Sequence, residues 1–343
     1  MSRKRIALIM LGCLVLLFCC SISSADEKQE KITLTYANFP PAPTFPCVQM
    51  ERWADEVEKR TGGMVEVKTF PGGTLLGAKN MFDGVVDGIA DIGNMAMSYQ
   101  PGRFPVSEAV DQPIGFPSAT VASLTLYDLI MYKYQPDEFK DVKIITLFTC
   151  PPSNFMTSKP VKKLEDLKGM ELRVSGTGVP VIKALGANPV AMPQSETPDA
   201  IQKGVVKGIV SSMEILKDFN FAAYCPFVTR QDMHVVTFSV VMNKKKWESL
   251  PGNVKQVIDD LRREQALWTG QYVDGHVEEA LEWSKKEHDL EIFTFPEEEK
   301  KEIKNRLQPL INDYIKRTKE KGLPAEEIME TVQYLKKSYS EKY

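Results

Sequence analysis

Segments with strand-like and helix-like patterns alternate along this chain, and this alternation constrains its fold more than any other feature. Strands are predicted from Ile32 to Ala37 and from Met64 to Phe70. Between them, Val48 to Arg60 has the pattern of an amphipathic helix, which Thr61-Gly62-Gly63 ends. Because strands and helices take turns in this way, we expect an α/β fold with a largely parallel sheet.

Two further features concern the arrangement of the chain into lobes. The segment GVVDGI at 84–89 recurs as GVVKGI at 204–209, each time after a predicted helix and before an apolar strand. Two lobes with the same arrangement of helices and strands would explain the repeat. The alternative is that Gly-Val-Val is simply a common connection between a helix and a strand. Apolar residues at helical spacing predict one long helix from Val254 to about Lys286. At 1.5 Å per residue it would span about 50 Å, enough to brace both lobes.

The N-terminus has the pattern of an export signal. Arg3, Lys4 and Arg5 precede an apolar stretch that runs to about Cys20, and small residues end at Ala25, so residues 1–25 are predicted to be a signal peptide. Lipid attachment at Cys19 or Cys20 is the alternative. The apolar stretch is too short for a membrane span, and no later segment approaches the roughly 20 apolar residues that a span needs. We therefore expect a periplasmic protein that does not itself cross the membrane.

Composition excludes several classes of function. The net charge of −3 offers no electrostatic case for binding nucleic acid. After the signal, Cys47, Cys150 and Cys225 are an odd number, so a disulfide framework is excluded while a single pair stays open. No group of His, Cys and Asp has the spacing of metal ligands, so we expect no metal and no cofactor.

The residues also give little support for catalysis. His276 and His288 lie in the charged part of the predicted long helix and are expected to face solvent, and His234 lies beside a predicted strand. Asp91 and Glu196 could act as a general base, but their positions are typical of helix or strand ends. We therefore predict that the protein is not an enzyme and has no catalytic residues, with an exported enzyme acting on a small acid as the alternative.

Arg173 is the strongest candidate for a binding residue. It closes a strand-like run of Met, Leu and Val and precedes Ser175-Gly176-Thr177-Gly178. Burying a guanidinium at the end of a strand costs free energy unless an anion pairs with it. The planar guanidinium can form two parallel hydrogen bonds with a carboxylate. The anion could be an organic acid or an internal Asp or Glu. A dinucleotide fingerprint fails here because Val181 stands where its third glycine belongs, but the following helix N-terminus could add donors for an anion.

Several segments, in their order and spacing, resemble the solute-binding subunits of tripartite ATP-independent periplasmic (TRAP) transporters. The likeness covers nearly all of the chain after the signal. The segments are Arg60-Thr61-Gly62-Gly63, Phe70 to Gly77, Gly84 to Asp91, Thr157-Ser158-Lys159-Pro160 with Leu167-Lys168-Gly169, Leu172-Arg173-Val174, and Val241 to Trp247 with Leu250-Pro251. The resemblance implies a two-lobed periplasmic-binding-protein-like fold with a long bracing helix, and a cleft that closes over an organic acid. It also implies that Arg173 pairs with the ligand carboxylate.

The resemblance also predicts the division into lobes and the ligand-binding residues. Lobe I would comprise residues 26–150 and about 239–278, and lobe II residues 151–238 and about 279–343. In this sequence Ser211 stands where the family often has a ligand-binding Asn, and Ser153 where some sialic-acid-binding members have a second arginine. The predicted ligand-binding set is Arg173, Ser153, Gln194, Ser211, Met213, Asn38, Phe39 and Asn94.

With few charged partners in the cleft, we expect a monocarboxylate with an apolar or aromatic body, delivered to the TRAP membrane subunits. Phe39, Met95, Met97 and Met213 would suit such a body, although core packing would explain these residues equally well. A C4-dicarboxylate receptor and an exported ligand-sensing module remain as alternatives. The sequence does not separate a monomer from a dimer.

Overall fold

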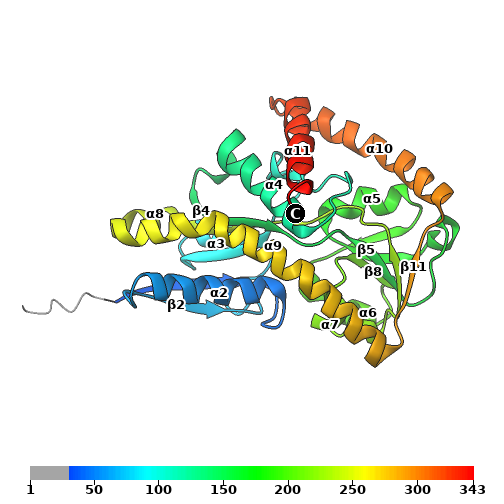
Figure 1. The fold of residues 1–343 in the computed structure, drawn as a ribbon, viewed down its shortest axis with the longest axis horizontal. Coiled ribbons are helices and arrows are strands. Elements are labelled where there is room, and N and C mark those ends of the chain that lie inside the picture. The colour runs from blue at the N-terminus through cyan, green and yellow to red at the C-terminus, as the bar shows by residue number, and fades with distance from the viewer. Residues whose placement is uncertain (1–30) are drawn as a thin grey trace, which may run out of the picture.

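The chain folds into two lobes, each built around one β-sheet (Figure 1). The structure is a computed structural model that describes residues 31–343, so the predicted signal peptide (1–25) and the alternative lipid site at Cys19 or Cys20 lie outside the described residues. The two-lobed α/β fold and its long bracing helix, as predicted, are confirmed.

The first lobe contains a five-stranded sheet. β1 pairs in parallel with β2 and β3, whereas β10 is antiparallel to both β3 and β4. In order across the sheet, the strands are β2 (Val65–Phe70), β1 (Ile32–Asn38), β3 (Ile92–Ala96), β10 (Thr237–Asn243) and β4 (Val142–Thr149).

The second lobe contains a six-stranded sheet, which also has one antiparallel strand among parallel ones. β5 is antiparallel to both of its neighbours, and the remaining pairs are parallel. In order, the strands are β11 (Glu291–Thr294), β9 (Phe227–Arg230), β5 (Asn154–Thr157), β8 (Gly208–Ser211), β6 (Glu171–Val174) and β7 (Asn188–Ala191). The antiparallel strands β5 and β10 each follow a passage of the chain from one lobe to the other.

Helices cover both sheets, and local sequence fixes several of their ends. α2 ends at Arg60, with Thr61 as its C-cap, because Gly62 and Gly63 adopt φ of 63° and 80°, which other residues rarely do. At the start of α4, the Ser118 hydroxyl accepts a hydrogen bond from the Val121 N–H. The helices are α2 (Phe45–Arg60), α3 (Met81–Val86), α4 (Ala119–Asp128), α5 (Val179–Ala184), α6 (Thr197–Gln202), α7 (Ile215–Asp218), α8 (Lys244–Ser249), α9 (Gly252–His288), α10 (Glu297–Glu320) and α11 (Ala325–Ser340).

α9 is the long bracing helix, with 37 residues and a length of about 55 Å. Figure 1 shows it running diagonally from β4 and α3 on the left to α6 and α7 at the lower right. Its residues up to Val273, among them Leu261, pack in the core of the first lobe, and Val277 and Leu281 nearer its C-terminus pack in a core of the second. At Gly270, a Cβ would lie only 2.6 Å from the Thr120 Cα, so the glycine allows α9 and α4 to touch.

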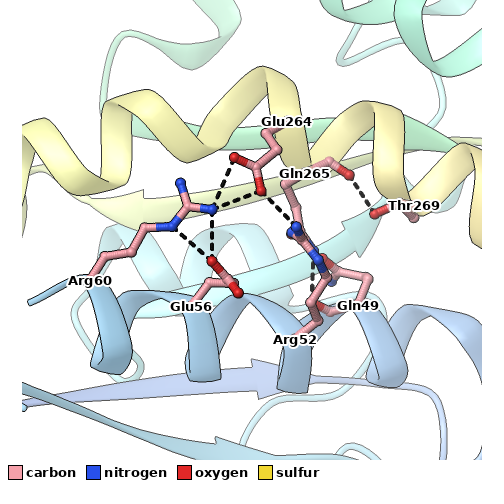
Figure 2. Close-up of polar contacts among 7 residues, drawn as sticks. All are labelled: Gln49, Arg52, Glu56, Arg60, Glu264, Gln265 and Thr269. Carbon is pink, nitrogen blue, oxygen red and sulfur yellow. Dashed lines mark hydrogen bonds and ion pairs between the residues drawn. The ribbon is translucent and has the colours of Figure 1, made fainter.

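Polar contacts fix α9 against α2, as Figure 2 shows. The Gln265 side-chain amide, which is fully buried, donates hydrogen bonds to the backbone oxygen (2.8 Å) and the side-chain oxygen (3.1 Å) of Gln49. Nearer the surface, Glu264 accepts hydrogen bonds from Arg52 (2.7 Å) and from Arg60 (2.8 Å). The buried amide pair sets the register between the two helices, because misplacing it would leave polar groups unsatisfied.

The internal repeat does not superpose residue by residue. Gly84 lies inside α3, whereas its sequence counterpart Gly204 follows the end of α6 with a φ of 68°. The structural equivalent of Gly204 is Gly88, which follows the end of α3 with a φ of 78°. In both lobes the chain therefore passes from helix to strand through a glycine. However, the identical residues of the two segments occupy different positions relative to the end of the helix, so the repeat is no evidence of duplication.

The C-terminal segment differs from the predicted lobe division. α10 contributes Ile303 and Leu307 to a core of the second lobe, but α11 contributes Ile328 and Val332 to the core of the first. Residues 325–340 therefore pack with the lobe opposite to the one predicted for 279–343, while the remaining boundaries stay a prediction. Among residues 31–343, no helix combines the length and the apolar character that crossing a bilayer requires.

Candidate functional site

A cavity lies between the two lobes at the carboxyl ends of the parallel strands. Phe39 follows β1 and Tyr99 lies just beyond β3, while Arg173 is the next-to-last residue of β6 and Ser211 ends β8. Open α/β sheets commonly bind ligands at this edge. The empty space of this cavity, together with its opening to solvent, is about 560 Å³. It is lined by Phe39, Pro40, Thr44, Phe45, Pro46, Tyr99, Cys150, Arg173, Ser175, Gln194, Val210, Ser211, Ser212, Glu214, Ile215, Asp218, Phe219, Val236 and Phe238.

Arg173 is 2% exposed and faces this cavity. The backbone oxygen of Met192 accepts hydrogen bonds from its Nε (3.2 Å) and Nη2 (2.8 Å), which fixes the plane of the guanidinium. Within the described residues, Arg173 forms no ion pair with an Asp or Glu. Burial lowers the pKa of Arg173, because the charged guanidinium loses its hydration. The alternative that Arg173 pairs with an internal Asp or Glu therefore finds no such partner among the described side chains.

Tyr99 joins the two lobes beside Arg173. Its hydroxyl accepts hydrogen bonds from the backbone N–H of Gln194 (2.9 Å) and from Nη2 of Arg173 (3.4 Å). Because Tyr99 belongs to the first lobe and the other two to the second, these bonds exist only when the lobes are closed. The sequence analysis missed Tyr99; its position directly after an apolar strand is the signal that could have found it.

Aromatic rings form the first-lobe wall of the cavity. Phe39 stacks on Phe238 with ring centroids 6.4 Å apart, and Tyr99 meets Phe39 edge to face at 5.5 Å. Phe45 packs edge to face on Phe238 at 6.0 Å. Such a wall favours a flat or apolar ligand body and excludes water from the ion pair that Arg173 could make.

Four residues of the predicted set line the cavity. Phe39 belongs to the first lobe, and Arg173, Gln194 and Ser211 belong to the second. The Nε2 of Gln194 is buried and has no hydrogen-bond partner within residues 31–343, so it is a donor available to a ligand. Their role in binding stays a prediction.

The structure does not bring the rest of the predicted set to the cavity. Asn94 donates a hydrogen bond to Asn38 (2.9 Å), which in turn donates to the Pro46 backbone oxygen (2.6 Å), so both amides tie the first lobe together behind Phe39. Ser153 is buried in the passage from β4 to β5 and is outside the lining. Met213 packs in a core of the second lobe and borders a different hollow.

Two acidic residues that the sequence analysis missed also line the cavity: Glu214, which precedes α7, and Asp218, which ends it. Asp218 forms a 2.7 Å hydrogen bond with His276 of α9. His276 is buried, so the expectation that it faces solvent was wrong: the second lobe covers this part of α9. The Asp218 carboxylate, which accepts a hydrogen bond from His276, raises the pKa of His276 and favours its protonated form.

His234 is buried, and neither ring nitrogen has a hydrogen-bond partner in the described chain. A Cβ on Gly178 would lie 2.7 Å from its Nε2, so this glycine makes room for the ring. The helix N-terminus that Gly178 opens was expected to hold an anion, but 176–178 lie outside the cavity lining. α5 has only 6 residues.

Replacing His234 should make stability less sensitive to acid. Burial lowers the pKa of His234 to about 4 from its usual 6.5. The unfolded chain therefore binds more protons between these pH values, and the wild-type protein loses stability as pH falls from 6.5 to 4. His234→Phe removes this penalty, so the stability of the variant relative to wild type should rise by about 3 kcal/mol between pH 7 and pH 4. Urea titrations of both proteins measure the difference, and parallel pH profiles would contradict it.

Other candidate groups have structural roles. Asp91 accepts hydrogen bonds from the N–H (2.8 Å) and hydroxyl (3.0 Å) of Thr35, whereas Glu196 is exposed at the start of α6. Cys47, Cys150 and Cys225 are buried and unpaired, which answers the question of a single disulfide. Within residues 31–343, no group of His, Cys, Asp and Glu could hold a metal ion.

This chain is similar to known bacterial solute-binding proteins in both sequence and structure. The model of the family "Bacterial extracellular solute-binding protein, family 7" matches residues 40–318. A TRAP periplasmic solute-binding protein from Desulfovibrio salexigens is 50% identical, with a TM-score of 0.83 over 91% of this chain and 98% of its own. In its crystal structure the C-terminus of a symmetry mate occupies the ligand-binding site.

Two more distant relatives differ in what they bind. A marine metagenome TRAP solute-binding protein from an unidentified microbe, specific for aromatic acid ligands, was solved with metahydroxyphenylacetate. It is 28% identical, with a TM-score of 0.86 over 90% of this chain and 99% of its own. The C4-dicarboxylate-binding protein DctB of Bacillus subtilis is 21% identical over 84% of each chain.

Proposed function

This chain belongs to the bacterial extracellular solute-binding proteins of family 7, the solute receptors of TRAP transporters, and we propose that its ligand is a monocarboxylate with an apolar or aromatic body. The observation that carries the proposal is Arg173: a buried cation in the interlobe cavity, with its plane fixed by Met192 and no acidic partner among the described residues. A ligand carboxylate between the lobes would form an ion pair with Arg173.

The proposed binding mode uses both lobes. The carboxylate accepts hydrogen bonds from Arg173 and from the free amide of Gln194, with the Tyr99 hydroxyl beside them. The body of the ligand lies against Phe39 and Phe238. Because one lobe supplies the anion contacts and the other the apolar wall, a ligand stabilises the closed state only when it touches both.

The remaining parts of the function follow from family membership. We propose that the protein is exported by its N-terminal signal, acts in the periplasm, and delivers the acid to the TRAP membrane subunits without chemical change. Cys150 on the cavity is a poor nucleophile, because burial raises the pKa of its thiol. An exported sensing module would have the same cavity, and uptake of the ligand by vesicles that carry the membrane subunits would separate the two roles.

A thermal-shift screen of organic acids tests the proposed ligand class. At a hundredfold excess over Kd, an aromatic monocarboxylate that binds should raise the melting temperature by about 5 °C. Succinate and malate, with the same charged group but a second carboxylate, should have little effect. Stabilisation by C4-dicarboxylates alone would contradict the proposal and favour the dicarboxylate receptor.

A further inference from the structure

Glu214 carries a buried carboxylate oxygen that nothing in the described chain satisfies. The side chain is 1% exposed and lines the interlobe cavity. Its Oε1 accepts a 2.6 Å hydrogen bond from the Ser212 hydroxyl, but its Oε2 has no partner among residues 31–343. An acceptor that is left unpaired in a buried place costs free energy, so the free oxygen needs an explanation.

Asp218 has a second such oxygen on the same cavity. Its Oδ1 is occupied by the 2.7 Å hydrogen bond with His276, and its Oδ2 is buried without a partner in the described part of the chain. An ion pair with His276 explains why an aspartate is tolerated there, but it leaves Oδ2 unused. We call Glu214 and Asp218 the acidic pair.

The acidic pair is separate from the cation of the cavity. Within residues 31–343, neither carboxylate lies within 4.0 Å of the Arg173 guanidinium, although all three groups line one space. The cavity thus has one point that attracts a carboxylate and another that accepts hydrogen bonds. Burial raises the pKa of Glu214 to about 7, so the carboxylate is mainly ionised above neutral pH.

We propose that the acidic pair is a second recognition point, which accepts a hydrogen bond from a hydroxyl or similar donor that the ligand carries away from its carboxylate. This inference rests on the proposed function, because it assumes that a monocarboxylate is bound at Arg173. It narrows the ligand class to acids with a separate hydrogen-bond donor. It also gives a physical reason for rejecting dicarboxylates, since a second carboxylate would meet like charge in a place without water.

Three benzoates that differ only at one ring position test the inference by calorimetry at pH 8. The probes are 3-hydroxybenzoate, 3-methoxybenzoate and benzene-1,3-dicarboxylate, which place a donor, an acceptor or a second anion at that position. Wild type should bind the hydroxy acid at least about tenfold more tightly than either of the other two. Affinities within twofold of one another would overturn the inference without touching the proposed function.

Variants then identify the residue that discriminates. Glu214→Gln keeps the size of the side chain but can turn an N–H toward the ligand, so the preference for the hydroxy acid should fall to about twofold or less. Glu165→Gln makes the same chemical change on the second lobe at a side chain that is 71% exposed, and it should leave the preference unchanged. An unchanged preference in Glu214→Gln would refute the role of the acidic pair. Failure of wild type to bind any of the three acids would instead contradict the proposed function.

Discussion

Arg173→Ala should lower the affinity for a carboxylate ligand by more than about a hundredfold. The guanidinium is the cation that the cavity presents to an anion, and the aromatic wall keeps water from replacing it. Without the guanidinium, the ligand carboxylate would be desolvated and unpaired. Leaving one charge of a buried ion pair without its partner costs much free energy. Isothermal titration calorimetry with an acid identified by the screen measures the loss.

The unliganded protein should not lose stability in this variant, because Arg173 has no acidic partner among the described residues. Equal or higher melting temperatures for Arg173→Ala without ligand would support this. Arg173→Lys keeps the charge but not the planar fork, so it should lie between wild type and Arg173→Ala. Arg306→Ala removes a surface arginine on α10 that pairs with Glu302, and it serves as the matched control. Unchanged affinity in Arg173→Ala would show that the anion binds elsewhere.

Gly176→Ala should weaken ligand binding by about tenfold or more, because it obstructs closure of the lobes. Gly176 belongs to the second lobe, and a Cβ there would lie 2.4 Å from the backbone oxygen of Ser98 in the first. A backbone atom cannot move aside as a flexible side chain can. The substitution therefore disfavours the closed state and leaves the open state untouched.

Small-angle X-ray scattering distinguishes this effect from a local defect. With saturating ligand, wild type should contract, whereas Gly176→Ala should remain closer to its unliganded dimensions. Gly77→Ala is the control, since a Cβ at Gly77 would meet nothing within 4 Å. Equal contraction and equal affinity in Gly176→Ala would mean that the ligand-bound lobes do not approach as closely as in this structure.

The sequence predicted those features that depend on local pattern. Alternation of elements gave the α/β class, helical spacing gave α9 to within two residues at each end, and a cation at the end of an apolar strand gave Arg173. These signals are local because the periodicity of a helix, or the cost of burying a charge, is already present in a short segment.

The features that the sequence did not predict depend on contacts between distant segments. His276 is 58 residues from Asp218, and only the packing of α7 on α9 shows that the histidine is buried. Asn94 donates a hydrogen bond to Asn38 on the neighbouring strand, so these two amides make contacts within the first lobe and do not line the cavity. The position of Tyr99 beyond an apolar strand is a local signal, but its contacts with Arg173 and Gln194 depend on how the two lobes pack.

A crystal structure of the wild-type protein with a bound acid from the screen tests the central claim most directly. We predict that the ligand carboxylate lies between the lobes on the Arg173 guanidinium, with the body of the ligand against Phe39 and Phe238. A ligand bound outside this cavity, or a carboxylate held by other residues while Arg173 makes no contact with it, would contradict the assignment.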